Sequence, residues 1–103
     1  MDTPSPNSSL LYGAYSGSLK VVKQAVADGA DLESVQAGMP LTALHLAIGR
    51  NHLDVVKYLI EDAGAPIKPD GFGRWPSVIA AQCRASDDLS EYIVECEAAA
   101  ERS

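Results

Sequence analysis

The stretch LTALHLAIGRNHLDVVKYLIEDAGA, from Leu41 to Ala65, decides the fold of this 103-residue chain. Its two apolar segments are separated by the short polar sequence GRNH at residues 49–52. In the second segment the apolar residues recur at helical spacing, and charged residues fill the positions between them. The pattern predicts two short amphipathic helices that fold back on each other, with Thr42 as the N-cap of the first.

Two further copies of this pattern flank the stretch. A shift of 34 residues aligns LKVVKQAVADGAD (19–31) with LDVVKYLIEDAGA (53–65), and a second shift of 34 aligns VVKYLIE (55–61) with LSEYIVE (89–95). The first helix of the third copy follows an offset of 33, so one residue is inserted in the turn RASDD that precedes the last helix. A unit of this kind cannot bury its apolar face alone, and about three units are the minimum for a stable stack.

The middle copy resembles an ankyrin repeat. The mark of that family is T-P-L-H-x-A-A, followed by a short turn, an apolar second helix and G-A-D. The residues that match this mark are Thr42, Leu44, His45, Leu46 and Ala47, with Ala43 in place of the usual proline. The outer copies match mainly through their spacing: SSLLYGAYSG (8–17) lacks the Thr-Pro and the histidine, and WPSVIAA (75–81) has Trp75 in the capping position.

The resemblance implies an all-α fold, an ankyrin-repeat solenoid of three helix-turn-helix units with hairpin-like loops. We expect a single domain over residues 7–103 and no fixed structure in residues 1–6; the repeats lie at approximately 8–40, 41–74 and 75–103. From position 87 onward there are six acidic residues and one basic residue, so the last helix is expected to be a polar C-terminal cap. The alternative for this acidic cluster is a charged docking patch.

The composition argues against several classes of partner. The formal net charge of −6 disfavours binding to nucleic acid or to anionic membranes. No apolar run approaches the ~18 residues that a membrane span needs. The two cysteines are too few for a disulfide scaffold, and the polar start MDTPSPNSS has no signal-peptide pattern, so we expect a cytoplasmic, reducing environment.

The sequence shows no catalytic, cofactor-binding or metal-binding constellation, and we expect neither an enzyme nor a cofactor. By the resemblance, the histidine at the position of His45 is structural, with its ring bonded to neighbouring loop backbone, and we expect a structural role for His52 as well. The segment GFGRW (71–75) is interpreted as a hairpin tip rather than a phosphate loop. A remote alternative is a thiol enzyme in which Cys83 pairs with one of these histidines.

Function is therefore expected on the surface of the stack. By the resemblance, partner proteins bind to a concave face formed by the hairpin loops and the exposed side of the first helices. Aromatic residues and arginine dominate the energetics of protein interfaces, and these loops are rich in such residues. The candidate partner-binding residues are Tyr15, Gln36, Met39, Leu41, Arg50, Phe72, Arg74 and Trp75. For Leu41 and Trp75, a structural role as plugs between repeats is an equal alternative.

We expect a small protein–protein interaction module that is monomeric when free and acts as an inhibitor, an immunity-type protein or a minimal adaptor. Arg50 and Arg74 would offer their guanidinium groups to carboxylates or carbonyls of the partner protein. The alternative is a structural subunit or a self-associating stack in which Phe72 and Trp75 are buried in the contact.

Overall fold

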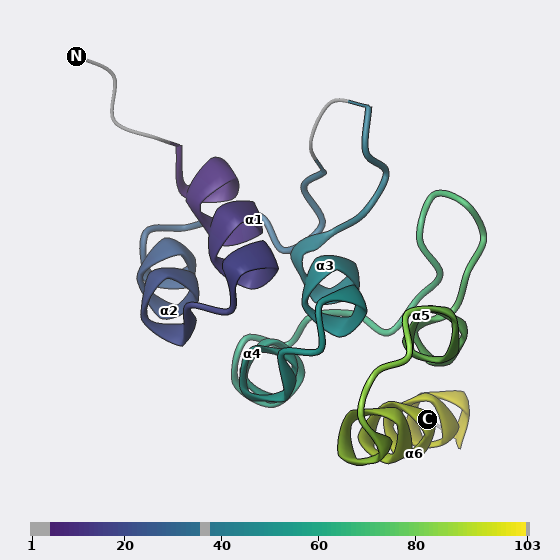
Figure 1. Cartoon of the computed structure of the whole chain (residues 1–103). Coiled ribbons are helices and arrows are strands. Elements are labelled where there is room, and N and C mark those ends of the chain that lie inside the picture. The colour runs from purple at the N-terminus through teal and green to yellow at the C-terminus, as the bar shows by residue number, and fades with distance from the viewer. Residues whose placement is uncertain (1–4, 36–37, 103) are drawn as a thin grey trace.

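The computed structural model describes residues 5–35 and 38–102. Its helices pair into three successive hairpins (Figure 1). They are α1 (Pro6–Ser16), α2 (Leu19–Ala27), α3 (Ala43–Gly49), α4 (Leu53–Lys57), η1 (Tyr58–Asp62), α5 (Pro76–Gln82) and α6 (Asp87–Arg102), where η1 is a π-helix that continues α4. The described residues contain no β-strand, in agreement with the predicted all-α class.

The helices form two rows. α1, α3 and α5 pack side by side as the inner row, and α2, α4 and α6 form the outer row (Figure 1). Two long loops, residues 28–42 and 63–75, project from the side of the inner row in their described parts. The predicted solenoid of three helix-turn-helix units is confirmed.

Each helix pair is closed by a turn that has one residue in the left-handed region. This residue is Gly17 in the first repeat (φ 84°), Asn51 in the second (φ 63°) and Arg84 in the third (φ 56°). Glycine adopts this conformation without steric cost, whereas an arginine does not. At Gly17 the packing adds a second constraint, because a Cβ atom there would lie 2.5 Å from Cε1 of His52 in the next repeat. The three turns are therefore equivalent in geometry although their sequences differ.

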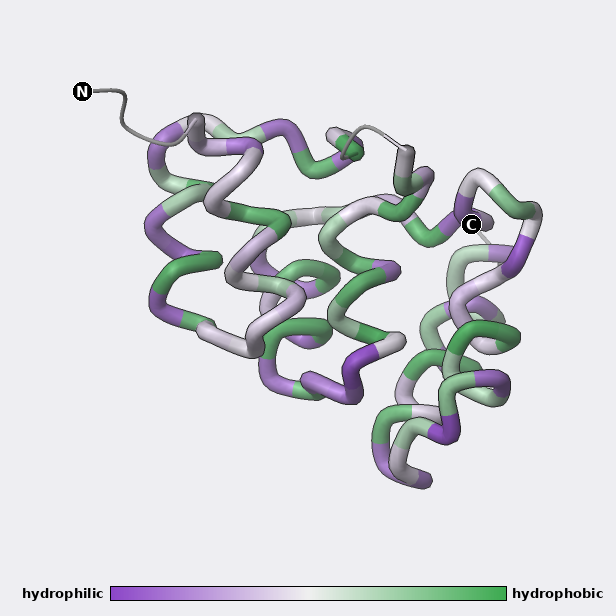
Figure 2. Tube along the Cα trace, turned by 45° about the horizontal axis from the view of Figure 1, so that its top comes forward, coloured by the Kyte–Doolittle hydropathy of each residue, from purple (hydrophilic) through white to green (hydrophobic). Residues whose placement is uncertain are grey.

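The core lies between the two rows, and every repeat contributes to it. Figure 2 shows apolar and polar residues alternating along the helices, as amphipathic helices require. The middle repeat is central, because α3 packs against α1, α4 and α5. The largest fully buried side chains are Leu10 and Val22, then Ile48, Val55, Val56 and Leu59, then Pro76, Ile79, Leu89 and Ile93.

The π-helix η1 accommodates one extra residue in the middle repeat. The hydrogen bond that closes the outer helix spans five residues in the first repeat, from the Ala30 N–H to the Ala25 carbonyl at 3.0 Å. Its counterpart in the middle repeat spans six residues, from the Ala65 N–H to the Leu59 carbonyl at 2.8 Å. Because a π-turn holds one more residue than an α-turn, the insertion leaves the apolar positions on both sides buried.

Helix α1 begins at Pro6, inside the segment (residues 1–6) for which the sequence predicts no fixed structure. Ser5 is the N-cap, and its hydroxyl accepts a hydrogen bond from the Ser8 N–H at 3.1 Å. Proline suits the first helical position because its φ is already helical and no N–H is lost there. The prediction therefore does not hold for Ser5 and Pro6, and residues 1–4 lie outside the described part of the chain.

The last helix caps the helix before it. Trp75 occupies the N-cap position of α5, as predicted, but its side chain makes no capping hydrogen bond. Instead, the Glu97 carboxylate of α6 accepts hydrogen bonds from the Ser77 N–H at 2.6 Å and from the Ser77 hydroxyl at 2.9 Å. A carboxylate is favoured at a helix N-terminus by the unpaired N–H groups and by the helix dipole. One residue of the acidic C-terminal cluster thus has a structural role within the stack.

Candidate protein-binding surface

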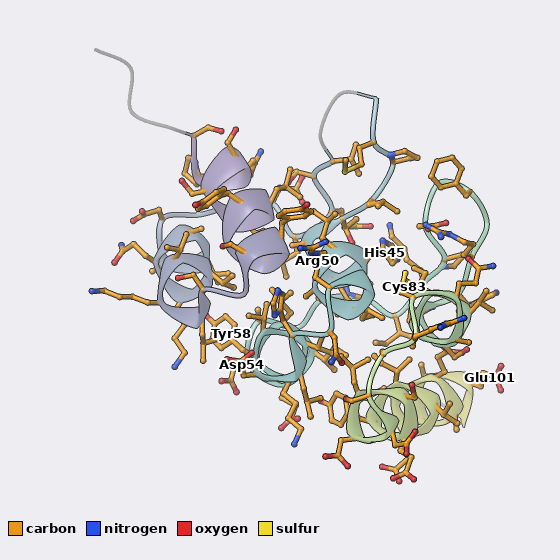
Figure 3. The ribbon with its side chains drawn as sticks, in the orientation of Figure 1. His45, Arg50, Asp54, Tyr58, Cys83 and Glu101 are labelled. Carbon is orange, nitrogen blue, oxygen red and sulfur yellow. The ribbon has the colours of Figure 1, made fainter. Side chains whose placement is uncertain are left out.

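We call the face formed by α1, α3, α5 and the two long loops the inner surface. Figure 3 shows Arg50 and Cys83 at the C-terminal ends of the inner helices α3 and α5, whereas Asp54 and Tyr58 lie on the outer row. Two groups of side chains organise this surface. One surrounds the second long loop, and the other lines a groove between α1 and the first long loop.

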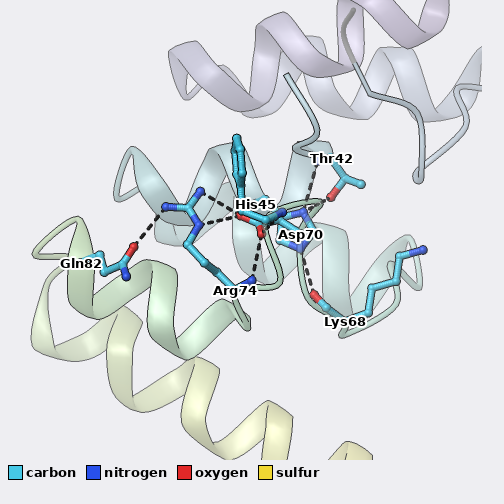
Figure 4. Close-up of polar contacts among 7 residues, drawn as sticks. Thr42, His45, Lys68, Asp70, Arg74 and Gln82 are labelled. Carbon is cyan, nitrogen blue, oxygen red and sulfur yellow. Dashed lines mark hydrogen bonds and ion pairs between the residues drawn. The ribbon is translucent and has the colours of Figure 1, made fainter. Parts of the chain in front are cut away.

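His45 fixes the base of the second long loop (Figure 4). Its Nε2 lies 2.9 Å from the Lys68 carbonyl oxygen, which can only accept, so Nε2 carries the proton. Its Nδ1 then accepts from the Thr42 N–H at 3.2 Å and lies 2.9 Å from the Thr42 hydroxyl. His45 as a whole is 2% exposed, and its ring has partners on both nitrogens. The predicted structural role of His45 is therefore confirmed.

Asp70 organises the tip of the same loop. Its carboxylate accepts hydrogen bonds from the Phe72 N–H at 2.9 Å and the Arg74 N–H at 3.0 Å, and from Nε of Arg74 at 2.8 Å. Burial raises the pKa of Asp70, but these hydrogen bonds and the Arg74 charge outweigh that effect, so its pKa lies below the ordinary value of 3.8. The buried carboxylate holds the hairpin tip that the segment GFGRW predicts.

Arg74 is already bound within the molecule. Its guanidinium pairs with Asp70 at 2.8 Å, donates to Oε1 of Gln82 at 3.2 Å and lies 5.4 Å from the centre of the Phe72 ring (Figure 4). These contacts leave few of its donors for a partner protein. Phe72 itself is 68% exposed and stands at the tip of the loop.

The groove lies at the other end of the inner surface and has a volume of about 560 Å³. Its floor is formed by Leu11 and Leu46, which are nearly buried. Its walls are the exposed or partly exposed side chains of Tyr12, Tyr15, Val35 and Met39, and its polar edge consists of Asn7, Ser8 and Ser34. Two tyrosines three residues apart on α1 thus face the first long loop.

Arg50 lies at the edge of this groove, between α1 and α3 (Figure 3). Its guanidinium is stacked on the Tyr15 ring at 4.4 Å from the centre. Within residues 5–35 and 38–102, no carboxylate pairs with Arg50 and no hydrogen bond of its side chain is found. In contrast to Arg74, Arg50 therefore keeps its hydrogen-bond donors.

Comparison with protein families decides the identity of the fold. A family model described as ankyrin repeats, in three copies, matches residues 10–102. The chain belongs to the ankyrin-repeat family. Members of this family are generally protein–protein interaction modules, and the family is non-catalytic. The matched residues extend from within α1 to the end of α6 and so include all three helix pairs of the structure.

A curated relative contains a similar segment. The liver isoform of mitochondrial glutaminase from Rattus norvegicus is 35% identical to this chain over 69 residues. The match covers 67% of this chain but 11% of the glutaminase. This similarity therefore concerns a small part of a much longer protein.

Six of the eight predicted partner-binding residues fall into the two groups of this ankyrin-repeat surface. Tyr15, Met39 and Arg50 meet at the groove, and Phe72, Arg74 and Trp75 lie on or beside the second loop. Leu41 is half-buried against the core, as a plug between repeats would be, whereas Trp75 is 46% exposed. Gln36 lies outside the described residues.

Sequence reasoning missed two residues that shape these groups. Tyr12 lines the groove, and Asp70 holds the second loop. Tyr12 could have been found because it lies one helical turn from Tyr15. The signal for Asp70 was the turn sequence Pro69–Gly71, in which an aspartate side chain commonly bonds nearby backbone.

The repeat stack offers no assembled catalytic or metal site among the described residues. Cys83 is an exposed free thiol on the inner row, but both imidazoles are engaged elsewhere, since Nε2 of His52 lies 3.1 Å from the Tyr15 carbonyl. The described part of the chain contains no cluster of three His, Cys, Asp or Glu residues that could hold a metal ion. Across the same residues, no helix is long and apolar enough to cross a membrane.

Proposed function

We propose that this ankyrin-repeat chain binds another protein through its inner surface and acts as a small inhibitor, an immunity-type protein or a minimal adaptor. Inhibition would follow from occlusion, because this chain, when bound, would cover the surface through which the partner protein contacts its own target. The free chain is a monomer in this proposal, and its setting is intracellular, where the free thiols Cys83 and Cys96 are stable.

The observation that carries the proposal is the placement of exposed apolar side chains. Within the described residues, eight large hydrophobic residues are exposed. One of them, Val94, lies on α6 in the outer row. The other seven lie on the inner helices or the long loops: Tyr12, Tyr15, Val35, Met39, Phe72, Trp75 and Val78. Apolar side chains gathered on one face mark an interaction surface.

The test begins with capture of the partner from a cell lysate, its identification by mass spectrometry and measurement of its affinity. Replacing Tyr15 and Phe72 by serine together removes one exposed anchor from each end of the inner surface. We expect this double variant to bind the identified protein at least ~10-fold more weakly. Its helical circular dichroism should match that of the wild type, because both side chains are exposed.

Val94→Ser is the matched control, since it removes an exposed apolar residue from the outer row. This control should retain wild-type affinity. Wild-type affinity in the double variant, or an equal loss in the control, would contradict binding through the inner surface.

Self-association is the alternative use of the same face. Size-exclusion chromatography with light scattering should give a monomer at every concentration if the surface is reserved for another protein. A dimer that forms with rising concentration and is lost in Phe72→Ser would favour a self-associating stack instead.

A further inference from the structure

We propose that the groove between α1 and the first long loop takes a short linear segment of the partner in which a bulky apolar side chain lies close to a carboxylate, with the carboxylate bound by Arg50. The inference rests on the proposed function and specifies the partner chemistry at one part of the inner surface.

The groove has room for one or a few side chains of a partner. Its volume of about 560 Å³ lies within the range of sites that hold small ligands or a few side chains. Leu11 and Leu46 form an apolar floor, and the exposed faces of Val35 and Met39 stand opposite α1. A long aliphatic or aromatic side chain would cover this apolar surface, which is otherwise in contact with water.

The tyrosines of α1 supply polar groups at the groove. The hydroxyls of Tyr12 and Tyr15 make no hydrogen bond within the described residues, and the two residues are 67% and 48% exposed. A tyrosine with an apolar ring and a free hydroxyl can cover a ligand side chain and bond its backbone at the same time. An extended segment presents such backbone groups along its whole length.

The charges at the groove favour a carboxylate. Among the described residues, no acidic residue lines the groove, and Glu33, the neighbour of Ser34 in the lining, already pairs with Lys68. Arg50 at the edge keeps its donors, and its stacking on Tyr15 holds the guanidinium in place before a ligand arrives. Arginine binds carboxylates through two parallel hydrogen bonds, whereas a lysine or arginine of the partner would be repelled.

The probe is a displayed library of random dodecapeptides, selected on the immobilised full-length chain. We expect the enriched peptides to share an aspartate or glutamate close to an aromatic or long aliphatic residue. Their affinity is then measured for the wild type, for Arg50→Gln and for Tyr15→Ser, with Lys23→Gln as the matched control. Lys23 is a suitable control because its Nζ also lies over a tyrosine ring, 5.6 Å from the centre of the Tyr58 ring, but on the outer row.

Arg50→Gln should bind the enriched peptides roughly tenfold more weakly than the wild type does, as expected for the loss of a hydrogen bond between charged groups. Replacing the peptide's aspartate or glutamate by the corresponding amide should weaken binding to the wild type by the same factor. It should not weaken binding to Arg50→Gln any further, because the peptide carboxylate and Arg50 would form one interaction. Tyr15→Ser should also weaken binding, and Lys23→Gln should leave it unchanged.

The inference is overturned if the library yields no binder, if the enriched peptides lack an acid, or if the amide change still weakens binding to Arg50→Gln. These results would leave the proposed function intact, because that depends on the identified partner and the Tyr15–Phe72 double variant. Wild-type affinity of that double variant for the identified partner would instead contradict the proposed function itself.

Discussion

The two ends of the inner surface carry the same kinds of residue but use them differently. At the second long loop, the Arg74 guanidinium is bound to the buried Asp70 carboxylate at 2.8 Å. At the groove, Arg50 lies on the Tyr15 ring at 4.4 Å and has no ion pair within the described residues. Residue type alone therefore does not separate structural residues from interface residues. The contacts that each side chain already makes within the molecule separate them.

The largest effect on the free energy of unfolding is expected from a change in α3, the helix between the two ends of the inner surface. Leu44 of α3 is 2% exposed, and α3 packs against both α1 and α5. Leu44→Ala should lower the free energy of unfolding by ~2–5 kcal/mol, through lost apolar burial and the cavity left behind. That loss is comparable to the whole stability of a small domain. Urea denaturation followed by circular dichroism measures it.

A Leu44→Ala variant with a stability within ~0.5 kcal/mol of the wild type would contradict the placement of the core, since surface changes have effects of that size. Val94→Ala on the exposed side of α6 provides the comparison value.

The next effect should be confined to the second loop. Asp70→Ala leaves the Arg74 guanidinium without its carboxylate and removes the acceptor of the Phe72 and Arg74 N–H groups. We expect a loss of ~3 kcal/mol in the free energy of unfolding, as when one partner of a buried ion pair is removed. Glu33→Ala breaks the exposed pair with Lys68 and should cost at most ~1 kcal/mol. Similar losses in the two variants would show that Asp70 does not hold the loop.

The same loop should make stability depend on pH in the acidic range. The pKa of Asp70 is lowered in the folded state, so the folded state binds its proton less tightly than the unfolded state does. Its contribution is therefore fully present above the ordinary pKa of 3.8 and is lost as the pH falls through the lower folded pKa. Urea denaturation at several pH values should show the difference between the wild type and Asp70→Asn shrinking below that pH. A difference that stays constant would contradict the lowered pKa.

The fold could be predicted almost entirely from the sequence, because the same helix-turn-helix pattern occurs in three copies along the chain. The offset of 34 residues and the middle motif with Thr42 and His45 predict the helix pairs, the Thr42 N-cap and the core. The π-turn at η1 was not predicted, although the later glycine of the middle repeat, Gly64, signals an extra residue. Whether such an insertion lengthens a loop or widens a helix depends on packing, which one sequence does not reveal.

The candidate surface could be predicted only by residue type. Exposed aromatics such as Tyr15 and Phe72 follow from their positions in the repeat. The difference between Arg50 and Arg74 does not, because it depends on how the second loop brings Asp70 against one arginine. The same holds for Glu97, which caps α5 from a position twenty residues away along the chain.

The smallest predicted effects give the most direct test, which compares the free energies of unfolding of Arg50→Gln and Arg74→Gln. Arg74→Gln breaks charged hydrogen bonds to a buried carboxylate, and we expect a loss of ~1.5–3 kcal/mol. Arg50→Gln removes only an exposed stacking contact, and we expect at most ~1 kcal/mol. Equal losses, or a larger loss for Arg50→Gln, would contradict the claim that one arginine belongs to the scaffold and the other is free for a partner.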